Sequence, residues 1–268
     1  MTRDRSAIDL ASARVLITND DGIEAEGLRR LVEIVRPLAR ETWICAPAEG
    51  HSGASAMVSL RREVTFEQQG ERAFAVGGRP ADCIHAALQL AMPDNPPDLV
   101  LSGINHGVNI GGDLIYSGTV GAAMTGAFNG IPAVALSADH PPKMPVADDT
   151  WDAIADHLPD VLRTVLRLGF ARGTVWGVNF PVTVTSPRPV LAYQGGTFDM
   201  MRFHPLDRAG RYIMHHQSPD REVSDYGGPD GPDGMSDFAA VRAGHITLTP
   251  LTIDRTDHAL LREAAEAL

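Results

Sequence analysis

Long apolar runs, a cysteine framework and an excess of basic residues are all missing from this sequence of 268 residues. No stretch of about 18 or more apolar residues is present, so the sequence predicts no membrane-spanning helix. Residues 1–13 are charged and lack the apolar core of a secretory signal. We therefore expect a cytoplasmic protein without a membrane partner.

The scarcity of cysteine and of basic charge narrows the chemistry further. Cys45 and Cys83 lie in apolar stretches without CxxC spacing, and we interpret them as buried, reduced thiols. Acidic residues outnumber basic ones by 34 to 23, which gives a formal net charge of −11. Because nucleic-acid polymers are held by clustered Lys and Arg, this balance argues against such a partner. An acidic chain that handles phosphate must rely on a bound cation, helix N-termini and backbone amides.

The first half of the chain alternates strand-like and helix-like patterns. Strands are expected at residues 15–18, 42–46, 99–101 and 133–136, with two more between 58 and 76 around a turn at 68–70; helices are expected at 24–39, 80–92 and 117–129. This alternation predicts an α/β fold, a mostly parallel sheet with helices on both faces.

The second half is less regular. A helix is expected at 151–168, a strand at 174–179, a short helix at 237–243, a strand at 245–249 and a last helix from Asp257. Between residues 195 and 234 the pattern dissolves into Gly, Pro, Asp and His, which is typical of an arm, a lid or a mobile loop. We expect a core of residues 14–140 and a smaller carboxyl-terminal part, 141–268, that completes it and projects an arm from about 195–234.

Three polar clusters follow predicted strands, where the ligand crevice of an open parallel sheet lies. The first is Asn19-Asp20-Asp21-Gly22, after the first strand. Two adjacent carboxylates at a strand end repel each other, and a hard divalent cation would compensate them. The alternative is an Asx-turn in which Asp21 caps the next helix.

The second cluster, from Ala46 to Ser55, follows the second strand and includes His51 and Ser52. Its hydroxyls and flexible backbone suit a cation or a phosphoryl oxygen, although an ordinary surface turn has the same composition. His51 is a candidate general acid or a solvated loop residue.

The third cluster begins at Ser102 and contains Asn105 and Asn109. Asn105 can complete a metal shell without adding negative charge. Ser117 is placed as a helix N-cap, with the amides of Gly118 and Thr119 exposed at a positive helix end, which is an anion site. The alternative is a helix of small residues packed tightly on the sheet.

Several other sites are excluded or set aside. There is no Gly-Lys-Ser/Thr phosphate loop, no Gly-x-Ser-x-Gly elbow, no HExxH and no Cys/His zinc spacing. His215 and His216 are adjacent and would face opposite sides of a strand. The aspartates between 225 and 237 lack calcium-loop spacing and are interpreted as a solvated, turn-rich segment. Asp82 lies in a first helical turn, where a structural role is expected.

Taken in order, these motifs resemble the SurE family, the survival-protein-E nucleotidases. The matching residues lie at 18–22, 46–47, 52–55, 80–83, 102–109, 117–123, 178–181, 236–237 and 246–251. The likeness spans about residues 14–255. Three positions depart from the pattern. Arg79 stands where threonine is usual, Thr125 stands where an acidic residue is common, and His51 replaces a more usual polar or basic neighbour of Ser52.

The resemblance implies a Rossmann-like core and a 5′/3′-nucleotidase that needs one divalent cation, Mg²⁺ or Mn²⁺. It also implies a homodimer or homotetramer built through carboxyl-terminal extensions, and some members hydrolyse short polyphosphate. By motif position, the metal ligands fall on Asp20, Asp21, Ser52 and Asn105, and the phosphate contacts on Asn109, Ser117, Gly118 and Thr119.

The chemistry expected of these residues is hydrolysis of nucleoside monophosphates by a metal-activated water, with Asp20 or Asp21 accepting its proton. The amides from Ser117 to Thr119 would hold the phosphoryl oxygens. Two alternatives stay open: a non-catalytic nucleotide or phosphate sensor on the same fold, and a metal-dependent glycoside or nucleoside hydrolase that uses the Asp pair.

Overall fold

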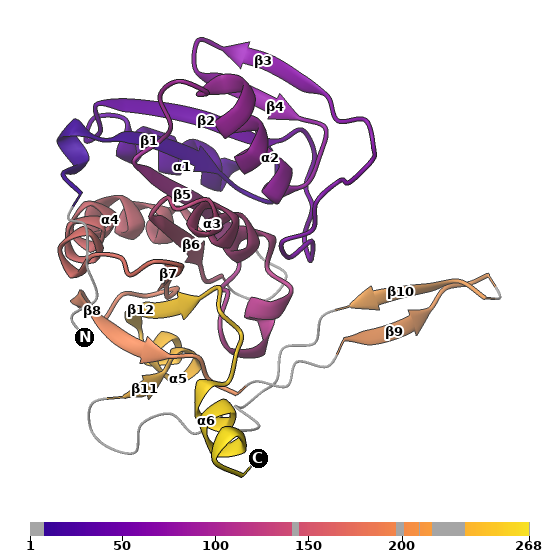
Figure 1. Ribbon diagram of the computed structural model, residues 1–268, viewed down its shortest axis with the longest axis vertical. Helices are drawn as coiled ribbons and strands as arrows, with labels where there is room; N and C mark the ends of the chain where they lie inside the picture. The colour runs from indigo at the N-terminus through magenta and orange to yellow at the C-terminus, as the bar shows by residue number, and fades with distance from the viewer. Residues whose placement is uncertain (1–7, 141–144, 197–200, 209, 216–233, 268) are drawn as a thin grey trace.

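A single ten-stranded sheet forms the centre of the computed structural model, which describes residues 8–140, 145–196, 201–208, 210–215 and 234–267 (Figure 1). The strands are β1 (Arg14–Thr18), β2 (Glu41–Pro47), β3 (Phe66–Gly70), β4 (Ala73–Val76), β5 (Leu99–His106), β6 (Ala133–Ala138), β7 (Thr174–Phe180), β8 (Ser186–Tyr193), β11 (Met235–Ser236) and β12 (His245–Thr252). Their order in the sheet is β11-β8-β12-β7-β6-β5-β1-β2-β4-β3.

Most neighbours in this sheet run parallel. Only the pairs β3–β4 and β7–β12 are antiparallel among the pairings within the described sheet. From β1 the chain adds β2 on one side and later β5 on the other. The direction of winding therefore reverses between β1 and β5, and ligands of open α/β sheets bind at such a point.

Helices cover both faces of the sheet because its central strands are apolar on both sides. On β1, Val15 and Ile17 pack with α1 (Glu26–Val35) and α4 (Asp148–Leu168), whereas Leu16 packs with α2 (Pro80–Ala86) and α3 (Gly118–Phe128). The side chains of one strand thus alternate between two cores. The remaining helices are α5 (Asp237–Arg242) and α6 (His258–Ala267), with a π-turn at Ala87–Ala91 and 3₁₀ turns at Leu10–Ser12 and Gly111–Ile115.

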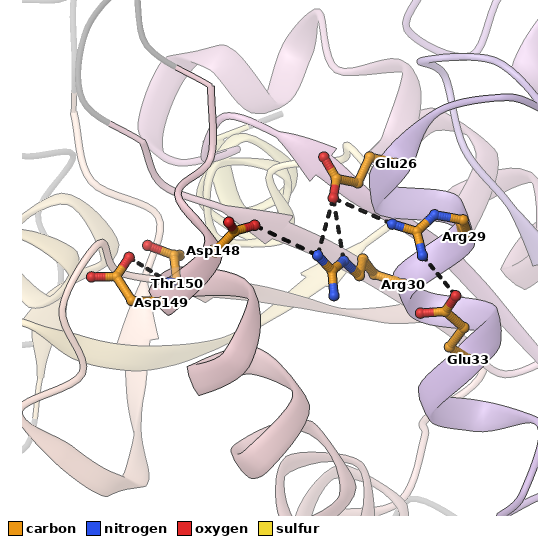
Figure 2. A network of polar contacts seen from close by, with 7 residues as sticks. All are labelled: Glu26, Arg29, Arg30, Glu33, Asp148, Asp149 and Thr150. Carbon is orange, nitrogen blue, oxygen red and sulfur yellow. Dashed lines mark hydrogen bonds and ion pairs between the residues drawn. The ribbon is translucent and has the colours of Figure 1, made fainter.

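The exposed side of α1 carries a network of ion pairs that reaches α4 (Figure 2). Glu26 contacts Arg29 at 3.4 Å and Arg30 at 3.2 Å, Arg29 contacts Glu33 at 2.7 Å, and Arg30 lies 3.7 Å from Asp148. Exposed pairs of this kind contribute at most about 1 kcal/mol each. What holds α1 on the sheet is therefore the burial of its apolar face, which includes Leu28 and Leu31.

The predicted fold class is confirmed: a mostly parallel sheet with helices on both faces. Several element boundaries were wrong. The region 58–76 forms strands only at β3 and β4, and Gln68, Gln69 and Gly70 belong to β3 rather than to the turn, which follows at Glu71 and Arg72. Strand β5 continues five residues beyond Leu101 to His106. Strand β8 was not predicted, because its half-exposed sequence contains two prolines and lacks a clear apolar alternation.

A two-stranded hairpin projects away from the sheet on the right of Figure 1. It consists of β9 (Arg202–Pro205) and β10 (Tyr212–His215), paired antiparallel. The sequence predicted no regular structure between 195 and 234, so the hairpin corrects that prediction; residues 197–200 and 216–233 of the expected arm lie outside the described residues. None of the helices in the described ranges is long and apolar enough to cross a membrane.

Candidate functional site

The three polar clusters of the sequence meet at the carboxyl ends of β1, β2 and β5. The backbone amide of His51, after β2, donates to the carbonyl oxygen of Asp20 at 2.6 Å. The hydroxyl of Thr119, at the start of α3, donates to Oδ1 of Asp20 at 2.5 Å. The amide of His106, at the end of β5, donates to Oδ2 of Asp21 at 3.3 Å. The Asp20-Asp21 pair is thus the point that all three segments contact.

Asp20 is directed toward the face of the sheet that α2 and α3 cover. Leu16, Thr18 and Asp20 continue the alternation of β1 on that side, and Asp20 lies against the N-terminus of α3. A Cβ built on Gly118 would lie 2.7 Å from Oδ2 of Asp20, so only glycine leaves room for the carboxylate there. The side chain of Asp20 is 4% exposed.

The electrostatics of Asp20 reflect this burial. Desolvation raises its pKa from 3.8 to about 6, and the charge of Asp21 adds to the increase. Hydrogen bonds from the hydroxyl and the backbone of Thr119 act in the opposite direction. Among the residues that the structure describes, no basic side chain contributes to stabilising the carboxylate. A cation bound beside Asp20 would supply the missing compensation.

Asp21 is less buried and has a different environment. Its pKa is also raised, first by desolvation, while the backbone hydrogen bond from His106 lowers it. The imidazole of His106 stacks on that of His140 with ring centroids 4.1 Å apart. Asn19, the residue before the pair, donates from Nδ2 to the carbonyl of Gly22 at 2.8 Å. Gly22 has φ of 105°, so this turn requires glycine.

Of the other two proposed metal ligands, Asn105 is half-buried at the next-to-last position of β5, and Ser52 is exposed in the loop after β2. Asn105 donates from Nδ2 to the carbonyl of Gly107 at 2.6 Å, which leaves its side-chain oxygen as the atom suited to a cation. The strand carrying it passes so close to α1 that a Cβ on Gly27 would overlap the carbonyl of Ile104. The structure places Ser52 next to His51, whose amide contacts Asp20.

The proposed phosphate contacts are only partly brought together. Ser117 caps α3 by accepting from the amide of Val120 at 3.0 Å, as predicted. The hydroxyl and backbone of Thr119, however, are engaged by Asp20. A phosphate at this helix end would therefore depend on the amide of Gly118 and on the hydroxyl hydrogen of Ser117.

Asn109 belongs to a separate network at the ends of β6 and β7. Its side chain donates to Oγ of Ser137 at 2.8 Å, and its backbone amide donates to Oδ1 of Asn179 at 2.8 Å. Asn179 in turn donates to the carbonyl of Asn109 at 3.1 Å. Sequence reasoning assigned no role to Ser137 or Asn179. Each is a polar residue near the end of an apolar strand, and this pattern could have identified them. Both side chains are buried.

The donor set fits a hard divalent cation. Among the described residues there is no group of three or more His, Cys, Asp and Glu that could hold a metal. The candidate set has two carboxylates and two neutral oxygens instead, and Mg²⁺ uses few carboxylates because it retains several waters. Thr18 Oγ1, Asn19 Oδ1 and Ser102 Oγ are buried without a hydrogen-bond partner at this same end of β1 and β5. Thr18 lies on the same side of β1 as Asp20, and an unpaired buried oxygen there is consistent with a bound hydrated ion.

Asp237 corrects one interpretation from the sequence. It was included in a solvated, turn-rich segment, yet it is 1% exposed. Its carboxylate accepts from the amides of Gly111 and Gly195, each at 2.9 Å. It therefore joins the loop after Asn109 to the point where the predicted arm begins. Spacing rules for calcium loops gave no information about this role.

Comparisons with known proteins show which family the chain resembles. The family model described as survival protein SurE matches residues 15–197. The 5′-nucleotidase SurE 1 of Burkholderia lata is 40% identical over 255 residues, covering 93% of this chain and 94% of that protein. The 5′-nucleotidase SurE of Erythrobacter litoralis is 36% identical over 269 residues, covering 94% and 98%. The crystal structure of the SurE protein from Aquifex aeolicus superposes with a TM-score of 0.75 at 28% identity, covering 95% of this chain and 99% of that one.

Proposed function

The chain belongs to the SurE family, and we propose that it is a nucleotidase, a divalent-metal-dependent phosphatase that hydrolyses nucleoside 5′- and 3′-monophosphates. Short-chain polyphosphate is a further proposed substrate. The observation that carries this proposal is the convergence of three segments on the Asp20-Asp21 pair beside the N-terminus of α3, where Asp20 is buried and receives no compensating charge from a basic side chain of the described residues. A cation would be bound there by the carboxylates, and a phosphate by the backbone amides at the N-terminus of α3.

The proposed ligands are Asp20, Asp21, Ser52 and Asn105, and the proposed cation is Mg²⁺ or Mn²⁺. When bound, such an ion would neutralise phosphoryl charge and acidify a water molecule. Asp20 is fixed by Thr119 and serves best as an anchoring ligand. Asp21 is half-buried and has a raised pKa, so it is the better group to accept a proton during attack.

The substrate would lie across the entrance formed by the start of α3. We propose that Ser117, Gly118 and Thr119, with Asn109, orient the phosphoryl oxygens. Because the hydroxyl of Thr119 donates to Asp20, we expect Thr119 to act mainly by holding that carboxylate. Ile115 and Tyr116 precede Ser117 and are 55% and 51% exposed, so they offer apolar surface to the nucleoside.

The experiment measures free phosphate released from AMP in the presence of manganese. We expect release by the parent protein and a loss of at least about a hundredfold in Asp20→Asn, because a ligand is removed. Activity of the variant within about threefold of the parent would reject the assignment of Asp20. AMP binding without phosphate release would instead favour a sensor, and release of free base would favour a nucleoside hydrolase.

A further inference from the structure

The loop that carries Ser52 is attached at both of its ends to the start of α2. At the first end, Nη1 of Arg79 lies 2.7 Å from Nδ1 of His51. At the second end, the amide of Ser59 donates to Oδ1 of Asp82 at 3.0 Å. Arg79 is the N-cap of α2 and Asp82 lies in its first turn. The start of α2 thus contacts both ends of the loop, residues 51–59.

The contact between Arg79 and His51 has a defined polarity. A guanidinium group has donors only, so Nδ1 of the imidazole accepts and the ring hydrogen lies on Nε2. The backbone of Gly78 makes another hydrogen bond to the same ring. The amide of His51 donates to the carbonyl of Asp20 at 2.6 Å. Arg79 is therefore linked through one residue to the centre of the proposed metal site.

Arg79 is itself held firmly at its backbone. Its amide donates to Oδ2 of Asp82 at 2.7 Å, and Pro80 begins the helix. A Cβ on Gly78 would lie 2.7 Å from the same carboxylate oxygen, so only glycine fits before Arg79. The guanidinium is thus presented from a fixed point, and its half-buried side chain loses little further freedom on contacting His51.

The middle of the loop has a second anchor. Ser55 donates from its amide to the carbonyl of Tyr116 at 3.0 Å and from its hydroxyl to the carbonyl of Ile115 at 2.8 Å. Ser52 and Gly53 lie exposed between this anchor and His51, and Gly53 has φ of 78°. The position of Ser52 therefore depends on two flanking attachments, one of which is the Arg79–His51 contact.

We propose that Arg79 is a positioning residue for the metal site: by holding His51, it fixes one end of the loop that carries Ser52 and so sets the affinity for the divalent cation. The inference rests on the proposed function, because Ser52 is a ligand only in that proposal. In this proposal Arg79 and His51 act together. Both are positions at which we expect the sequence to depart from the family pattern. Arg79 acts through His51 and has no direct contact with substrate.

The test measures Mn²⁺ binding to the substrate-free protein by isothermal titration calorimetry. Arg79→Gln removes the cation and weakens the hydrogen bond, and we expect about tenfold weaker Mn²⁺ binding, as for other residues that orient a metal ligand. Arg72→Gln is the matched control. Arg72 lies on the neighbouring edge of the sheet over the ring of Trp43 at 5.7 Å, and its loss should leave Mn²⁺ binding unchanged.

A double-mutant cycle separates this role from a direct substrate contact. In a His51→Gln background, Arg79→Gln should cause no further loss, because both changes break the same link. Additive losses of Mn²⁺ affinity, or a higher KM for AMP with unchanged Mn²⁺ affinity, would overturn the inference.

If Arg79→Gln fails to fold by circular dichroism, Arg79→Lys keeps a charged donor and should bind Mn²⁺ with an intermediate affinity; parent-like affinity in that variant would also overturn it.

The two proposals fail in different ways. If the parent protein binds no Mn²⁺ and releases no phosphate, the proposed function is wrong. If the parent does both and Arg79→Gln binds Mn²⁺ within about twofold of the parent, only the role of Arg79 is rejected.

Discussion

At the scale of single residues, Asp20 is the clearest departure from what stability alone would favour. A carboxylate that is 4% exposed costs free energy unless charge or hydrogen bonds compensate it. Thr119 supplies hydrogen bonds, yet burial still raises the pKa to about 6. The ionised carboxylate, which predominates above about pH 6, is therefore under-compensated in the metal-free protein, and a bound cation would supply the missing compensation. Groups strained in this way are commonly functional.

This pKa predicts how the stability of the metal-free protein depends on pH. Because the folded pKa lies above the unfolded value of 3.8, the contribution of Asp20 is fully present below about pH 4 and is lost as pH rises through about 6. Between about pH 4 and about pH 8 the loss should be about 2 kcal/mol. We expect the free energy of unfolding of Asp20→Asn to lack this decline, as measured by urea denaturation in EDTA.

Added metal supplies the control for that experiment. Mn²⁺ favours the ionised carboxylate, so the parent should regain stability at about pH 8 and gain little at about pH 4. Asp20→Asn should gain little at either pH. Parallel curves for parent and variant across the whole range in EDTA would contradict the assignment of the shift to Asp20.

The sequence identified Asp20 and Asp21 because paired carboxylates after an apolar strand are conspicuous. It did not identify Asp237, whose neighbours in sequence are turn formers and whose partners, Gly111 and Gly195, are 126 and 42 residues away. It also could not show that Arg79 contacts His51, 28 residues distant. Such contacts depend on tertiary placement, which no local pattern records.

At the scale of elements, the approach of α3 to the Ser52 loop determines the width of the site. Gly121, one turn into α3, faces the backbone of Ser55, and a Cβ built there would overlap the Ser55 carbonyl. Nearby, the hydroxyl of Thr125 donates to the carbonyl of Gly121 at 2.7 Å. The helix and the loop can be this close only because the helix carries glycine at position 121.

We therefore predict that Gly121→Ala loses about 2 kcal/mol or more of stability, despite the higher helix propensity of alanine, because overpacking against backbone is costly. Its phosphate release should fall as the loop moves. Gly126→Ala is the matched control in the same helix: its nearest neighbour would be a side-chain methyl of Val100 at 3.1 Å, which can shift. We expect a change within about 1 kcal/mol for it. Equal thermal melts for the two variants would argue against this packing.

Around the site, the sequence predicted best the strands that are covered by helices on both faces of the sheet. Residues 15–17 and 133–136 are apolar throughout, and strands β1 and β6 contain them. The end of β5 was missed because Ser102 and Asn105 are polar, and polarity was taken as the end of the strand. Its extension depends on pairing with β6, where Asn105 lies opposite Ser137 across an irregular register. Tertiary pairing overrode the local pattern there.

At the scale of the whole molecule, the strands of the second half extend the same sheet. Strand β7 pairs with β6, and β12 and β8 follow it. The buried carboxylate of Asp237 attaches this half to the loop after Asn109 through Gly111. The origin of the predicted arm and a loop of the candidate site thus share one hydrogen-bonding group, so changes at one can reach the other.

The hairpin of β9 and β10 suggests how copies of the chain associate. It projects from the sheet (Figure 1), and its large apolar side chains are exposed: Phe203 is 70% exposed and Tyr212 is 60% exposed. The two rings contact each other edge to face, with centroids 6.5 Å apart. An apolar projection of this kind is typical of an interface. We predict that it contacts a neighbouring subunit in a homodimer or homotetramer.

Phe203→Ser tests this prediction by light scattering coupled to size exclusion. The variant should show a smaller multiple of the chain mass than the parent at equal concentration, because an interface anchor of this size contributes about 2 kcal/mol or more. Phe128→Ser is the matched control, since Phe128 is 74% exposed at the far end of α3, and it should keep the parent mass. An unchanged mass in Phe203→Ser, or an equal decrease in both variants, would show that the hairpin does not hold the subunits together.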